Sequence, residues 1–168
     1  MDLKNYSDNQ IDQWIKNHEE KSATASELYR RLLEERARRQ SSGLNVENSL
    51  RHLIAAAKAG RFTTYGDLAA ASNVPWGTAR YAMNGQNGHL DRLLDICHAR
   101  HIPLLTAICV NQQNIRTGKL SAESLKGFIK GAQRVGYSIL NEEEFLRDCQ
   151  KQCFEWAKTQ DEAVTATH

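Results

Sequence analysis

Apolar positions follow a helical period through the first forty residues. The segments 7–21 and 25–40 each place apolar side chains on one face, and Ser7 stands where a helix cap is expected. Gly43 follows the second segment and can adopt the left-handed backbone that ends a helix. The pattern predicts an N-terminal helical hairpin over residues 1–43. Its apolar stripe needs a partner, which is either a second copy of the chain in a homodimer or the rest of the same chain.

The rest of the chain predicts a helical core over residues 44–160 and a disordered tail over residues 161–168. Residues 104–110, "LLTAICV", form the apolar run most typical of a buried strand. The polar residues 111–119 after it predict the return of a β-hairpin with a basic tip. The predicted helices of the core cover residues 46–60, 65–72, 75–84, 88–101, 121–136 and 141–160.

The stretch "YGDLAAASNVPWGTARYAMNG", residues 65–85, has the features of a helix-turn-helix. Asn73 stands at the reversal, where a left-handed backbone is needed, and Pro75 suits the start of the second helix. An internal helical corner with buried aromatic rings is the alternative. The order of parts favours DNA binding, because two short helices, a third helix, a buried strand and a basic hairpin describe a winged helix.

The predicted fold is therefore mainly α. It has a winged helix-turn-helix core with a small β-hairpin, flanked by the N-terminal helical hairpin and a C-terminal helix. The residues expected to contact DNA lie on the helix-turn-helix and on the hairpin that would be its wing. They are Thr64, Tyr65, Trp76, Thr78, Arg80, Tyr81, Asn84, Arg116 and Lys119.

Charge is distributed unevenly along the chain. The net charge is +2, but residues 51–134 carry 11 basic and 4 acidic side chains, a net +7, while residues 1–50 carry −1 and residues 135–168 carry −4. A basic excess on the segment that holds the helix-turn-helix is expected for a surface that faces a polyanion. A solvated basic surface, neutralised by the acidic C-terminal helix, is the alternative interpretation.

The segment "GRFTTYGDLAAASNVP" resembles the start of the DNA-binding domain of the O6-alkylguanine-DNA alkyltransferases and alkyltransferase-like proteins. The likeness is close over residues 60–74, fades through the second helix, and returns faintly at "IPLLTAICVNQQN", where that family carries its Pro-Cys-His-Arg strand. The resemblance implies a winged helix-turn-helix that binds DNA. Leu104 and Leu105 stand here at the positions of the reactive Cys and its His, and a leucine cannot accept an alkyl group, so alkyl transfer is excluded.

The four cysteines do not predict a metal centre. Cys149 and Cys153 are four residues apart, as are Cys97 and His101, so a zinc site is conceivable. However, no Cys-x-x-Cys pair is present, and small apolar thiols on helices usually serve packing. We expect no metal, no cofactor and no catalytic residue.

Composition is that of a soluble globular protein, with 40% hydrophobic and 25% charged residues. No apolar run approaches the ~20 residues of a membrane span, and the N-terminus lacks a secretion signal, so a cytoplasmic location is expected. The prediction is a non-enzymatic protein of bacterial or phage type that binds double-stranded DNA, as a transcriptional regulator or as an accessory protein of repair or defence. The alternatives are a protein–protein interaction module (an antitoxin, immunity or adaptor protein) and an enzyme whose site is not apparent.

Overall fold

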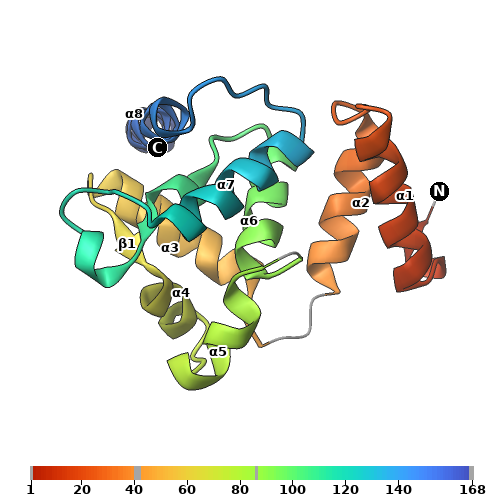
Figure 1. Cartoon of the computed structure of the whole chain (residues 1–168), viewed down its shortest axis with the longest axis horizontal. Coiled ribbons are helices and arrows are strands. Elements are labelled where there is room, and N and C mark those ends of the chain that lie inside the picture. Colours follow the sequence, from red (N-terminus) through yellow and green to blue (C-terminus); the bar gives the residue numbers. More distant parts are fainter. Residues whose placement is uncertain (1, 40–42, 86, 167–168) are drawn as a thin grey trace.

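The computed structural model describes residues 2–39, 43–85 and 87–166, with side chains through residue 160. It is mainly helical with a small two-stranded sheet, which confirms the predicted mainly α class (Figure 1). The strands are β1 (Thr63–Thr64) and β2 (Cys109–Val110). The α-helices are α1 (Asp8–Glu20), α2 (Glu27–Arg38), α3 (Val46–Lys58), α4 (Tyr65–Ala71), α5 (Trp76–Met83), α6 (His89–Ala99), α7 (Ala122–Arg134) and α8 (Glu142–Ala166).

Local sequence sets most helix boundaries. The side chains of Ser7 and Ser121 accept hydrogen bonds from backbone N–H groups three residues later, and these bonds cap α1 and α7. Gly60 and Gly136 follow the C-caps of α3 and α7 directly and have positive φ angles of +69° and +111°. Gly43 also has a positive φ, +84°, but α2 already ends at Arg38, so this glycine does not stop the helix as predicted. Caps and left-handed stops of this kind explain why the sequence places these boundaries to within a few residues.

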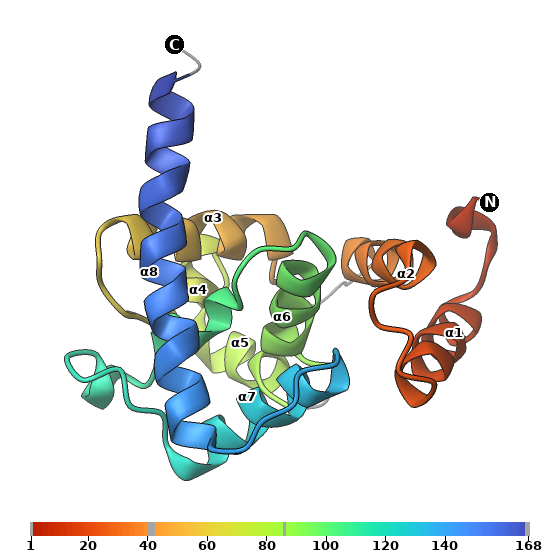
Figure 2. The same ribbon diagram turned by 90° about the horizontal axis from the view of Figure 1, so that it is seen from above.

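The core forms where the apolar faces of α3, α6, α7 and α8 enclose residues 104–110. Each of these seven residues is buried, and Leu105, Ala107, Ile108 and Val110 expose none of their surface. Figure 2 shows α8 crossing the core above α3, in agreement with the packing of α8 against α3, α7 and residues 105–108. The buried segment is therefore surrounded by helices on several sides.

The predicted β-hairpin over residues 104–119 does not form. Residues Leu105–Ile108 are a short 3₁₀ helix, and β2 pairs with β1 in parallel, with Thr63 opposite Cys109 and Thr64 opposite Val110. Residues Gln112–Asn114 form another 3₁₀ turn within a surface loop. The apolar run reflects burial among helices, and burial alone does not distinguish a strand from a turn. The described residues thus contain the two short helices α4 and α5 but no antiparallel wing.

The N-terminal hairpin folds back on the core. Helix α2 lies beside α6 (Figure 1), and the apolar stripes of α1 and α2 bury one another. Ala99 is the only residue of α6 within their apolar cluster. The other buried members of that cluster are Leu3, Ile11, Ile15, Tyr29, Leu32 and Leu33. The stripe is covered inside one chain, so its burial does not require a dimer.

Charged side chains provide much of the contact between hairpin and core. The carboxylate of Asp95 on α6 is 1% exposed and receives Arg36 Nη2 of α2 at 3.0 Å and Arg134 Nη2 of α7 at 2.5 Å. Arg92 Nη1 lies 3.8 Å from the same carboxylate. One buried carboxylate therefore meets three guanidinium groups from three helices.

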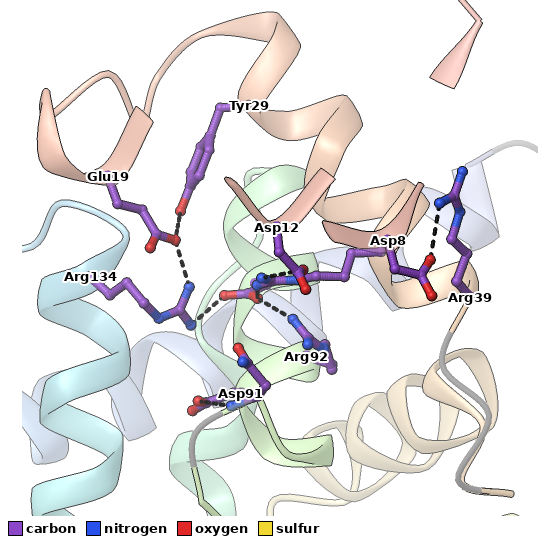
Figure 3. Close-up of polar contacts among 11 residues, drawn as sticks. Asp8, Asp12, Glu19, Tyr29, Arg39, Asp91, Arg92 and Arg134 are labelled. Atoms are coloured by element: carbon purple, nitrogen blue, oxygen red, sulfur yellow. Dashed lines mark hydrogen bonds and ion pairs between the residues drawn. The ribbon is translucent and has the colours of Figure 1, made fainter. Parts of the chain in front are cut away.

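Arg134 extends this network back to the hairpin. Its Nη1 donates to Glu19 at the end of α1 at 3.0 Å, and Glu19 also accepts the Tyr29 hydroxyl at 2.8 Å (Figure 3). Burial lowers the pKa of Arg134, but the carboxylates of Asp95 and Glu19 raise it above its ordinary value. Arg134 thus stays charged and joins α7 to both the hairpin and α6.

Two predicted boundaries differ from the structure or lie partly outside it. Helix α8 continues to Ala166, so the tail predicted to start at residue 161 is helical through that residue. No glycine or proline lies in residues 142–166 to stop the helix earlier. Residues 40–42, which precede the predicted end of the hairpin at residue 43, and residues 167–168 of the predicted tail lie outside the described residues.

Candidate nucleic-acid interface

The predicted helix-turn-helix corresponds to α4, a turn over residues 72–75, and α5. The Thr64 side chain accepts from Asp67 N, and Asp67 accepts from Thr64 N, which makes a capping box at the start of α4. Asn73 has φ +58°, the left-handed conformation expected at the reversal, and Val74 N donates to Ala69 O at 3.0 Å. The turn is therefore fixed by local bonds that the sequence pattern had indicated.

Helix α5 presents a wide polar and aromatic outer surface. Ala79 and Met83 bury one side of the helix against the core, at 1% and 0% exposure. Six of the residues from 76 to 84 are exposed and define what we call the outer face of α5. They are Trp76, Gly77, Thr78, Arg80, Tyr81 and Asn84. Five of these six were predicted as DNA contacts, and the structure brings those five together on one side of a short helix.

Arg80 and Tyr81 form a pair on this outer face. The Arg80 Cζ atom lies 4.7 Å from the centre of the Tyr81 ring, and Arg80 Nη2 donates to the Tyr81 hydroxyl at 2.6 Å. Tyr81 remains 76% exposed. The pair holds a positive charge beside an accessible aromatic ring, a combination that binds anionic and planar groups.

Thr64 and Tyr65 were predicted to contact DNA, but both are buried and so do not belong to the exposed surface. They are 5% and 7% exposed, because Thr64 lies in β1 and caps α4 while Tyr65 packs into the core. Burial raises the pKa of Tyr65 to about 12. Both residues shape the helix-turn-helix from within. At the start of such a short helix, the sequence pattern does not distinguish a side chain that contacts DNA from one that is buried.

Arg116 and Lys119 lie on the loop that replaces the predicted wing. Both are exposed, and the loop is held down where Gln150 Nε2 of α8 donates to Gly118 O at 2.8 Å and to Ala107 O at 3.0 Å. Gly118 has φ +73° and stands against the Phe62 ring, so a side chain there would collide with it. Figure 1 shows the loop on the other side of α4 from α5. These two basic residues therefore lie apart from the outer face of α5.

Part of the basic excess of residues 51–134 is neutralised by ion pairs within the molecule. Arg92 and Arg134 meet Asp95, and Arg100 pairs with Glu34 at 2.8 Å and with Glu47. The remaining eight basic side chains of the segment are exposed, against two exposed carboxylates, Asp67 and Glu123. The eight are Arg51, Lys58, Arg61, Arg80, Arg116, Lys119, Lys126 and Lys130. The exposed surface of this segment thus keeps a positive excess.

A series of hydrogen bonds at the start of α4 was not predicted from the sequence. His52 Nε2 of α3 lies 2.7 Å from Thr63 Oγ1, and that hydroxyl donates to Asp67 at 3.1 Å. The residues are 11 and 4 positions apart in the sequence, and only the packing of α3 on β1 and α4 brings them together. These hydrogen bonds fix the start of α4, and α5 follows α4 directly after the turn.

The side chains most able to act as nucleophiles are enclosed. Ser49 Oγ lies 2.7 Å from His89 Nε2, but the two residues are 0% and 1% exposed. All four cysteines are buried, and burial raises the pKa of Cys97 and Cys149 to about 12. Leu104 and Leu105 are buried apolar residues. Among the described residues, no three His, Cys, Asp or Glu side chains are placed to hold a metal ion.

Comparison with models of protein families, with curated proteins and with solved structures found no match for this chain. In the part of the chain that the structure describes, no helix combines the length and the apolar character that crossing a membrane requires.

Proposed function

We propose that this protein is a non-enzymatic DNA-binding protein whose helix-turn-helix contacts DNA through the outer face of α5. The observation that carries the proposal is the division of α5 into a buried side and a side with six exposed neighbours. The exposed basic excess of residues 51–134, the segment that includes α4 and α5, supports a polyanionic partner. The resemblance of residues 60–74 to the alkyltransferase-like DNA-binding domain points the same way.

The side chains of the outer face supply two kinds of contact with DNA. Arg80 and Asn84 carry the groups that hydrogen-bond base edges, and Thr78 can donate to a phosphate oxygen. The loop that carries the exposed Arg116 and Lys119 lies on the other side of α4 from α5 (Figure 1). Its basic side chains can hold phosphates, but the loop does not extend α5 as a wing would. In this proposal the protein is located in the bacterial cytoplasm, where it has access to DNA. It acts there as a transcriptional regulator or as an accessory protein of repair or defence.

A protein–protein interaction module is the second candidate. Trp76 and Tyr81 are exposed, and aromatic rings with arginine are enriched in the cores of protein interfaces. The same outer face of α5 would then hold a protein partner instead of DNA. The two candidates differ in how much of their binding energy comes from charge.

Salt dependence separates these two functions. The full chain is titrated into a labelled mixed-sequence duplex at about 50 mM and about 200 mM salt, and binding is followed by fluorescence anisotropy. We expect binding that weakens steeply with salt, because basic side chains release counterions from the phosphates. Absence of binding both to the duplex and to its separated single strand at the lower salt concentration would contradict the proposal and favour the protein–protein module.

A further inference from the structure

The exposed residues of α5 include one position, Gly77, that carries no side chain. With 3.6 residues per turn, Gly77 and Tyr81 fall on one strip of the helix, and Trp76 and Arg80 on the neighbouring one. A side chain at Gly77 would find no atom within 4 Å, so the backbone there is open. The backbone of the outer face is therefore exposed at Gly77, with the Tyr81 ring on the same strip and the Trp76 ring on the neighbouring one.

Both rings are unusually accessible for their type. Trp76 is 44% exposed and Tyr81 is 76% exposed, whereas Trp14 and Trp156 are half-buried against apolar clusters. Among the described residues, only Tyr137 and Leu140 are other large hydrophobic side chains with comparable exposure. Two exposed rings on one eight-residue helix therefore offer aromatic surface to a planar partner.

The charge beside these rings favours an anionic partner such as a nucleic acid. The Arg80 guanidinium is held beside the Tyr81 ring by its contact with that ring and its bond to the hydroxyl. No acidic residue lies in α5 or in the turn before it. Stacking of bases on aromatic rings, with a nearby cation for the backbone, is how proteins bind single strands without reading their sequence.

The same face is poorly equipped to read the edges of a closed duplex. Only Arg80 and Asn84 have groups suited to paired hydrogen bonds with base edges, and Arg80 already donates to Tyr81. The loop with Arg116 and Lys119 stands away from α5 (Figure 1). In a duplex the base faces are stacked on one another and cannot reach Trp76 or Tyr81, while in a single strand they are free.

We infer that the outer face of α5 binds single-stranded DNA more tightly than duplex, by stacking unpaired bases on Trp76 and Tyr81. The inference rests on the proposed function, since it names the form of DNA that the same face selects. Gly77 lets the sugar–phosphate backbone lie close to the helix, and Arg80 neutralises a phosphate there.

The test compares one labelled oligonucleotide as a single strand and as a duplex, with the full chain at the lower salt concentration. We expect the single strand to bind at least about fivefold more tightly. Tyr81→Ala is expected to weaken single-strand binding by about 5- to 150-fold, the range for loss of one stacked base. Tyr81→Phe keeps the ring and should bind nearly as wild type does.

Two controls make the result specific to α5. Tyr137→Ala removes an exposed ring outside α5 and should leave single-strand affinity unchanged. Quenching of tryptophan emission by the single strand should be largely lost in Trp76→Phe, because the other two tryptophans are half-buried. Melting followed by circular dichroism checks that each variant is folded.

The outcomes separate this inference from the function on which it rests. Equal or tighter binding of the duplex, or equal losses on both forms of DNA in Tyr81→Ala, overturns the preference for single strands while leaving DNA binding by α5 intact. Failure of both forms to bind contradicts the proposed function and this inference together.

Discussion

His89 shows how one buried side chain can set the pH range of the fold. It is 1% exposed at the start of α6, bonded through Nε2 to Ser49, and its Nδ1 is buried without a hydrogen-bond partner. Burial lowers its pKa to about 4 from an ordinary 6.5. The folded protein therefore holds a neutral imidazole at pH values at which the unfolded chain already binds a proton.

The sign of the resulting pH dependence follows from this difference. Stability from the neutral His89 is fully present above pH 6.5 and is lost as the pH falls toward about 4, because the unfolded state gains the proton first. We expect a loss on the order of 2 kcal/mol in the free energy of unfolding between pH 7.5 and pH 5. Urea titrations of the wild type and of His89→Gln measure it. An equal loss in the variant would show that His89 is not the cause.

Docking of the hairpin depends on a carboxylate that links three helices. Asp95 of α6 is almost fully buried and meets arginines of α2 and α7 as well as Arg92 of its own helix. Removal of one partner from a buried ionic network leaves uncompensated charge, which costs more than an exposed pair contributes. No local pattern connects Arg36, Asp95 and Arg134, so the sequence predicted the helices but not this contact between them.

Asp95→Asn should therefore destabilise the protein by about 3–5 kcal/mol, since three guanidinium groups would share one fewer carboxylate. Asp12→Asn is the matched control, because Asp12 contacts the same Arg36 at 3.4 Å but is 51% exposed. Its effect on the free energy of unfolding should be far smaller. Urea denaturation of both variants at pH 7.5 compares them, and similar losses would show that the buried carboxylate has no special part in docking.

At the scale of the whole molecule, the sequence predicted elements better than their assembly. Caps and left-handed positions such as Ser7, Asn73 and Gly136 act locally and are visible in the sequence. The prediction of a wing was wrong because residues 104–110 are apolar owing to their burial among helices. They contribute only β2 to a sheet. For the candidate site, the polar and aromatic residues from 76 to 84 indicated the outer face of α5, but the residue types did not show that Thr64 and Tyr65 face inward.

The central claim is that the outer face of α5 is the DNA site, and the duplex affinity of Arg80→Ala tests it most directly. We expect binding to weaken by about 5- to 150-fold with an unchanged melting temperature, because Arg80 is exposed and one arginine contact is worth about 1–3 kcal/mol. Arg147→Ala, an exposed arginine on α8, is the control and should bind as wild type does. Wild-type affinity in Arg80→Ala, or the same loss in Arg147→Ala, would contradict the claim.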